Sequence, residues 1–137
     1  MIAPPLAGNV LGSADNSFAV AEWRDPGGES SSLRYIAPWH VHHNDDEAWY
    51  VLEGALSIRA GDDVIELQAG SAYLVSRGTP HTYWNPGPEP VRYLLFMTPA
   101  ILRLIQCIHA ASDRSPAAMS ALFAEHNSAL VTPPAGF

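Results

Sequence analysis

Between residues 40 and 97 the chain consists of short β-prone runs, each ended by glycine or proline. The run 56–60 alternates apolar and polar residues, which is the period-two signal of a strand with one buried face. Gly61-Asp62-Asp63 is typical of a tight turn, since glycine tolerates positive φ. Short strands at this spacing predict an all-β barrel or sandwich. The predicted strands are 48–52, 56–60, 64–67, 72–75, 81–84 and 91–97.

The region before residue 40 is less regular. Residues 1–16 are rich in Pro and Gly and are interpreted as an arm that pairs with a neighbouring molecule or a sheet edge. Strands are predicted at 17–23 and 33–37, on either side of a loop that is rich in Gly and Ser. These flanking elements would extend the β-sheet region.

After Thr98 the apolar period changes to that of helices. Thr98 with Pro99, and Ser115 with Pro116, predict two helix starts, because a hydroxyl caps the first turn and proline suits its first position. We interpret the apolar stripes of both helices as packing surface against the barrel or a second subunit. The stripes comprise Ile101, Leu104, Ile105 and Ile108, then Met119, Leu122 and Phe123.

Composition narrows the functional classes. The 137 residues suggest one domain, 1–137, and 47% hydrophobic content argues against disorder. A net charge of -7 is a poor match for nucleic acid or an anionic membrane. Cys107 is the single cysteine and forms no disulfide within the chain. Without a basic segment or an apolar run of about 18 residues near Met1, we expect a cytoplasmic protein.

Three histidines and a glutamate are candidate metal ligands. His40 and His42 are alternate residues, so in a strand their side chains share one face. Glu47 follows across a turn, and His81 begins a later predicted strand. If that strand lies beside the first, the four groups converge inside the barrel. This set suits a divalent transition metal with open positions, unlike a closed, sulfur-rich zinc site.

The remaining histidines and the two aspartates near the cluster are not expected to be metal ligands. His43 has the wrong strand parity, so, like His109 and His126, it is expected to be a surface or core residue. Asp45 and Asp46 are interpreted as turn formers in a solvated loop.

The spacing of these residues strongly resembles the two motifs of the cupin family. The first motif is matched by Pro38, His40, His42, Glu47 and Gly54, and the second by Gly70, Gly78, His81 and Asn85. Arg34 and Ser76 stand where the motifs have Gly and Pro, which bears on turn geometry rather than on metal binding. The resemblance covers residues 33–98 closely, with 99–137 as a helical segment and tail.

The resemblance implies a cupin double-stranded β-helix, a jelly-roll barrel, with short C-terminal helices. It implies that His40, His42, Glu47 and His81 bind one divalent metal. Fe(II) is favoured, with Mn, Ni, Zn and Cu as alternatives. It also implies a homodimer in which the N-terminal arm and the helices take part.

Strand parity predicts an apolar, partly aromatic pocket around the metal. Tyr83 shares the face of His81 and is a candidate pocket residue. On the last strand two inward-facing sets stay open. The residues predicted to line the pocket with Tyr83 are Asn85, Trp49 and Val51, then Ala72, Leu74, Leu56 and Ile58, with either Tyr93, Leu95 and Met97 or Leu94 and Phe96.

Four functions are weighed, and the one that fits least is storage or a purely structural role, which does not need all four ligands together. The first is a mononuclear Fe(II) dioxygenase-like enzyme for a small organic molecule, with Glu47 as a proton acceptor if it loosens from the metal. The second is a Lewis-acid isomerase, cyclase or decarboxylase. The third is a non-catalytic small-molecule binding module.

Overall fold

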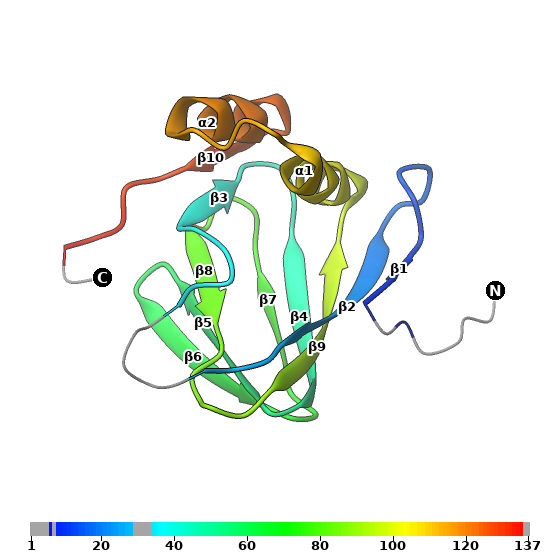
Figure 1. Ribbon diagram of the computed structural model, residues 1–137, viewed down its shortest axis with the longest axis vertical. Coiled ribbons are helices and arrows are strands. Elements are labelled where there is room, and N and C mark those ends of the chain that lie inside the picture. Colours follow the sequence, from blue (N-terminus) through cyan, green and yellow to red (C-terminus); the bar gives the residue numbers. More distant parts are fainter. Residues whose placement is uncertain (1–5, 7, 29–33, 136–137) are drawn as a thin grey trace.

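The computed structural model describes residue 6, residues 8–28 and residues 34–135. These residues form two five-stranded antiparallel sheets that face each other, with two helices across one end (Figure 1). The first sheet has the order β1–β2–β9–β4–β7, formed by Val10–Leu11, Ala19–Asp25, Val91–Met97, Glu47–Glu53 and Ala72–Val75. The second sheet has the order β10–β3–β8–β5–β6, formed by Ser128–Leu130, His40–His42, His81–Trp84, Ala55–Ala60 and Asp63–Gln68. This architecture confirms the predicted jelly-roll fold.

Alternate residues of the strands fill the space between the sheets. In β9, Tyr93, Leu95 and Met97 are buried, whereas Leu94 and Phe96 on the opposite parity are partly exposed. The structure therefore selects the first of the two sets left open by the sequence. Each large side chain removed from water stabilises the sandwich by about 1.5–3 kcal/mol. The most deeply buried apolar residues include Trp49, Val51, Leu56, Ile58 and Leu95.

A close backbone approach shapes the turn between β4 and β5. Gly54 has a φ of +78°, and a Cβ at this position would lie 2.4 Å from the carbonyl oxygen of Pro90. Any other residue would collide with the segment that enters β9 and would adopt a disfavoured backbone conformation. Glycine is therefore required at the end of the first motif, where the chain passes from the first sheet to the second.

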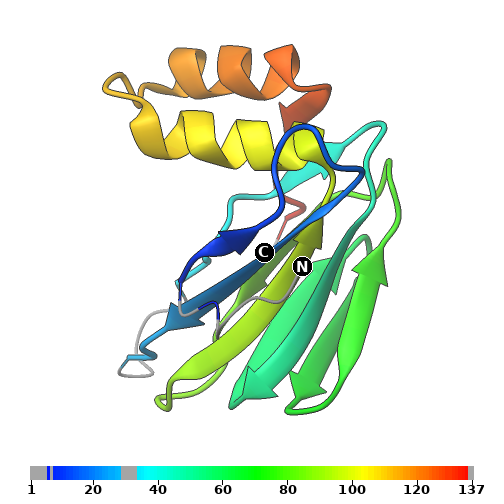
Figure 2. The ribbon, with the colours of Figure 1, turned by 90° about the vertical axis from the view of Figure 1, so that its right-hand side faces the viewer.

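Helices α1 (Pro99–Ala110) and α2 (Pro116–Glu125) begin where the sequence predicts. The side chains of Thr98 and Ser115 each accept a hydrogen bond from a backbone N–H of the first turn, and proline follows each cap. Figure 2 shows both helices across one end of the sandwich, with α1 next to the sheets and α2 on the far side of α1. The side chains that α1 buries are Ile101, Leu102 and Leu104.

Neither helix among the described residues is long and apolar enough to cross a membrane.

Two predicted elements before residue 40 are confirmed only in part. The strand predicted at 17–23 is present as β2, and β1 pairs with it at the sheet edge, as expected of the arm. The strand predicted at 33–37 is wrong over 34–37, where Tyr35 forms only an isolated bridge with Trp84. Residues 1–5, 7 and 29–33 of these predictions lie outside the described residues.

The inward face of β7 was predicted with the wrong parity. Glu47 pairs directly with Val75, so these two residues share the inward face of the first sheet. Val75 is accordingly buried, whereas Leu74 is 57% exposed. All four residues of the strand are apolar or aromatic, so its own pattern does not indicate the buried face.

Large apolar side chains are exposed on the outer side of the first sheet. Phe18, Leu74 and Phe96 are 63%, 57% and 37% exposed and line a shallow depression. Exposed apolar patches commonly mark contacts with other molecules. The homodimer expected from the sequence stays a prediction.

Candidate metal centre and its cavity

The first three side chains of the candidate site come from two adjacent strands of the second sheet. His40 and His42 are alternate residues of β3, and His40 pairs directly with His81 at the start of β8. All three are buried, with exposed fractions of 5%, 3% and 1%. The Nε2 atoms of His40 and His42 lie 3.1 Å apart. Strand pairing thus brings together histidines that are about forty residues apart in the chain.

Glu47 completes the group from the opposite sheet. It is the first residue of β4, and its Oε2 lies 3.0 Å from Nε2 of His81 and 3.4 Å from Nε2 of His42. The four side chains offer ligand atoms that all lie within 4.8 Å of one another. The structure therefore gathers the four residues predicted from the sequence into one buried cluster. His43, which parity excluded, is exposed.

Hydrogen bonds on the outer side of the cluster fix the tautomers of the imidazoles. Nδ1 of His40 lies 2.7 Å from the carbonyl oxygen of Pro38, and Nδ1 of His81 lies 2.8 Å from that of Thr79. Because a carbonyl only accepts, each Nδ1 carries the proton and donates it. Each Nε2 therefore presents a lone pair to the centre of the cluster.

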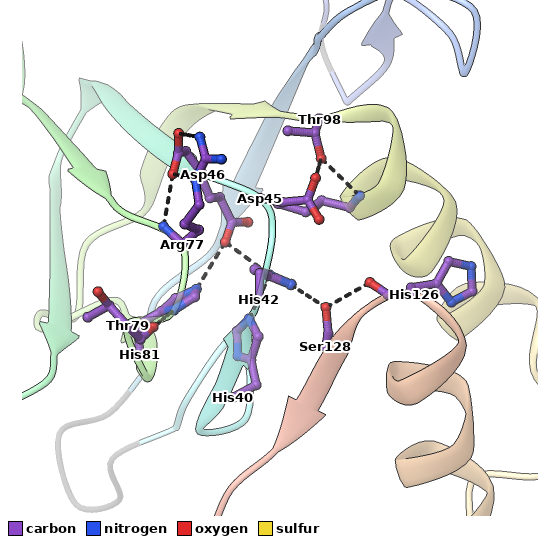
Figure 3. A network of polar contacts seen from close by, with 12 residues as sticks. His40, His42, Asp45, Asp46, Arg77, Thr79, His81, Thr98, His126 and Ser128 are labelled. Atoms are coloured by element: carbon purple, nitrogen blue, oxygen red, sulfur yellow. Dashed lines mark hydrogen bonds and ion pairs between the residues drawn. The ribbon is translucent and has the colours of Figure 1, made fainter.

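Ser128 does the same for the third imidazole. Its Oγ lies 2.7 Å from Nδ1 of His42 and donates a hydrogen bond to the carbonyl oxygen of His126 (Figure 3). Since the hydroxyl proton is used on that carbonyl, Oγ accepts from Nδ1, and Nε2 of His42 is again unprotonated. Outer-shell partners of this kind orient metal-ligating histidines in proteins generally.

The donor set fits a divalent cation. Three nitrogen lone pairs and a carboxylate meet without a proton between them, and such an arrangement is repulsive unless a positive charge lies at its centre. Ligand atoms about 2.1 Å from an ion and at right angles to each other lie about 3.0 Å apart. The contacts of 3.0, 3.1 and 3.4 Å agree with that spacing. The cluster could thus hold one metal ion with part of its coordination sphere open.

Burial and charge support the same protonation states. Burial lowers the pKa of His40 to about 4, so this imidazole is neutral near pH 7. Burial alone would raise the pKa of Glu47, but the neighbouring imidazole groups of His42 and His81 hold it well below its usual range. The site therefore combines neutral imidazole with an ionised carboxylate, which are the forms that bind metals.

The loop between His42 and Glu47 connects the cluster to its surroundings. Asp45 accepts a hydrogen bond of 2.7 Å from the Thr98 hydroxyl at the start of α1. Asp46 accepts from the backbone N–H of Arg77 and from its guanidinium group (Figure 3). Both aspartates lie in the loop between β3 and β4, as expected, and their carboxylates also anchor this loop to two other segments.

A cavity of about 330 Å³ opens beside the cluster. Its inner part is formed by His40, His42 and Glu47 together with buried apolar and aromatic side chains from β8, β9 and the two helices. Its rim is formed by partly exposed side chains of β2, segment 36–38 and the second half of α1. The helical stripes predicted as packing surface also line this cavity, mainly through Ile101, Leu104, Ile105, Ile108 and Phe123.

Tyr83 lies on the cavity wall, as parity suggested, and contacts a second tyrosine. Its hydroxyl lies 3.3 Å from that of Tyr93, and the two rings meet edge to face. Burial raises the pKa of Tyr83 well above its ordinary value and that of Tyr93 to about 12, so both phenols are neutral. A catalytic role for Tyr83 stays a prediction.

Sequence reasoning missed several residues of the site. Ser128 belongs to a three-residue strand in a tail predicted only as extended chain, and no local signal marks it. Trp23 and His109 lie at the cavity rim with ring centroids 6.4 Å apart. Their parity on β2 and helical spacing on α1 could have placed them on inward faces, although not beside each other.

A double-stranded β-helix with a buried group of three histidines and one glutamate defines a class of metal-site barrels. The chain belongs to the cupin family, whose domain model matches residues 25–97.

Known relatives support this assignment. The chain is 32% identical over 60 residues to the tetracenomycin polyketide synthase protein TcmJ of Streptomyces glaucescens, covering 44% of this chain and only 40% of that protein. A Klebsiella pneumoniae protein with a double-stranded β-helix domain is 28% identical, with a TM-score of 0.54 over 66% of this chain and 74% of that chain. A Bacteroides fragilis cupin shares the fold at 21% identity, with a TM-score of 0.57 over 72% and 80% of the two chains.

Proposed function

We propose that the chain is a metal-dependent enzyme that acts on a small, largely apolar organic molecule. The observation that carries this proposal is the buried set of four converging acceptor groups at the inner end of a cavity of about 330 Å³. Small-molecule sites are typically concave and apolar, with a few polar groups that fix orientation. The residues proposed to hold one divalent metal, with Fe(II) as the favoured ion, are His40, His42, Glu47 and His81.

The reaction that we propose first is an oxygenase reaction on a phenolic or carbonyl compound. A divalent ion at this site supplies Lewis acidity and, if it is iron, redox chemistry with dioxygen. The chain's own contribution is to orient the molecule, since α1 and β9 enclose it with apolar side chains. The mostly apolar wall also lowers the polarity around the molecule, which strengthens each polar contact inside. Glu47, whose carboxylate faces the cavity, is the proposed proton acceptor, on condition that it is released from the metal.

The second candidate is a reaction without dioxygen, such as isomerisation or cyclisation. The observation that favours it is the pair of neutral phenols, Tyr83 and Tyr93, in the cavity wall. A phenol at this position can donate a proton to a substrate oxygen. Turnover that continues without oxygen would favour this candidate over the first.

Elemental analysis of the purified protein and of the His81→Ala variant tests the metal centre. We expect about one transition-metal ion per chain in the natural protein and strongly reduced metal in the folded variant, because one of four ligands is lost. Equal metal content in both proteins, with circular dichroism showing a folded variant, would refute the ligand set. Iron-loaded protein is then assayed for dioxygen uptake with phenols and diketones. A compound bound and released unchanged, with no turnover in air or under nitrogen, would leave a binding module instead of an enzyme.

A further inference from the structure

The cavity contains a second polar group besides the candidate metal cluster. The hydroxyls of Tyr83 and Tyr93 lie 3.3 Å apart and come from opposite sheets, β8 and β9. Both residues line the cavity and are buried, with exposed fractions of 5% and 2%. Polar atoms at such depth normally have all their hydrogen bonds made within the protein.

One hydroxyl proton of the tyrosine pair has no acceptor within the pair. Each hydroxyl carries one proton, and the contact between them uses only one of the two. Among the described residues no further acceptor is bonded to either hydroxyl. The neighbouring indole of Trp49 can only donate, so it does not accept this proton. This end of the cavity therefore presents one hydroxyl proton that lacks an acceptor.

The surroundings indicate which acceptor would fit. The described residues that line the cavity include no Lys or Arg, and its other walls are mostly apolar. An anionic group such as carboxylate or phosphate would be buried there without a counter-charge, which is costly. A neutral oxygen, either a carbonyl or a hydroxyl, can accept the free proton at no such cost.

The distance between the tyrosine pair and the candidate metal cluster limits how far apart two oxygens of a bound substrate can lie. His81 and Tyr83 are alternate residues of β8, so their backbones are about 7 Å apart along the same face. We propose that the Tyr83–Tyr93 hydroxyl pair is a specificity subsite for a second, neutral oxygen of the substrate. This inference rests on the proposed function, in which the first oxygen lies at the metal centre. The substrate class is then a rigid, flat or aromatic compound with oxygens at opposite ends.

The test compares two probes, 2,6-dihydroxynaphthalene, which has two such oxygens, and 2-naphthol, which has one. Affinities are measured by calorimetry for zinc-loaded and metal-free protein, since zinc has no redox chemistry of its own. We expect the natural protein to bind the diol about tenfold more tightly, as one hydrogen bond in a dry site warrants. The deciding variant is Tyr83→Phe with Tyr93→Phe, because one remaining hydroxyl could still donate. Tyr50→Phe, which changes a partly exposed tyrosine on the outer face of the first sheet, is the matched control.

In the double variant the diol preference should fall to about one while metal content stays unchanged. In the Tyr50→Phe control the preference should persist. An equal preference in the natural protein and the double variant, or no binding of either probe by the natural protein, would overturn the subsite. Failure of the metal centre is seen separately as absence of bound zinc. A diol preference that depends on both hydroxyls in metal-free protein would still support the subsite.

Discussion

Replacing Ser128 by alanine should weaken metal binding, although Ser128 is not itself a proposed ligand. The serine hydroxyl accepts the Nδ1–H of His42 at 2.7 Å and is 3% exposed. Without it, the imidazole has two choices. It can leave a buried Nδ1–H unpaired, or move the proton to Nε2 and lose the lone pair that faces the cluster.

The structure allows an estimate of the effect. An unpaired buried donor costs about 1–3 kcal/mol. Metal-free protein can avoid most of this cost by changing tautomer, but the metal-bound protein cannot, because the metal needs Nε2. The cost therefore appears mainly in the free energy of metal binding, where about 1.4 kcal/mol corresponds to a tenfold change in the dissociation constant. We therefore expect the dissociation constant for zinc to rise about 10–100-fold, in the range known for outer-shell partners of metal ligands.

Competition with a chromophoric zinc chelator at constant pH measures this constant. The control is Ser120→Ala, which removes the hydroxyl of an exposed serine on α2. The unfolding free energy of metal-free Ser128→Ala protein, from urea titration, should fall by much less than the binding free energy. Zinc affinity equal to that of the control would refute the assignment of the His42 tautomer and, with it, the outer-shell role of Ser128.

Two further variants probe the helical cover of the cavity. Thr98→Ala removes the cap of α1 and the hydrogen bond to Asp45. The unfolding free energy measured by urea titration should therefore fall by about 1 kcal/mol. An unchanged unfolding free energy would mean that the cap contributes nothing. Leu104→Ala should cost about 2–5 kcal/mol, because Leu104 is 1% exposed. If Leu104 also limits the cavity, the same variant should bind larger aromatic probes more tightly in calorimetry, and an unchanged size limit would contradict that position.

The part of the site that could be predicted from the sequence is the part set by short-range geometry. His40 and His42 share a face because side chains alternate along any strand, and the positions of Glu47 and His81 follow from motif spacing. Ser128 could not be found in this way, since it meets His42 across 86 residues of chain. Its three-residue strand is defined by pairing with β3 and has no pattern of its own.

The misassigned face of β7 has a related cause. Its residues are apolar or aromatic throughout, so the buried side is chosen by pairing of Val75 with Glu47 and not by the strand itself. For the two helices, the sequence predicts where each begins but not where each packs. Their starts follow from local capping residues, whereas their place over the cavity depends on contacts between distant segments. Local patterns thus predict elements better than they predict which elements meet.

The residues that line the cavity come from two parts of the chain, one inside and one outside the segment that matches the family model. The candidate ligands lie within residues 25–97, which match the family model, whereas Ile101, Leu104 and Phe123 lie beyond it. Changes in the helices can therefore alter which molecules fit without touching the side chains that gather around the ion. In this chain, the groups proposed to hold the ion and the residues that limit the size of a bound molecule thus lie in separable segments. Ser128 is the exception, because it ties the C-terminal segment beyond the family match to the ligand cluster through one hydrogen bond.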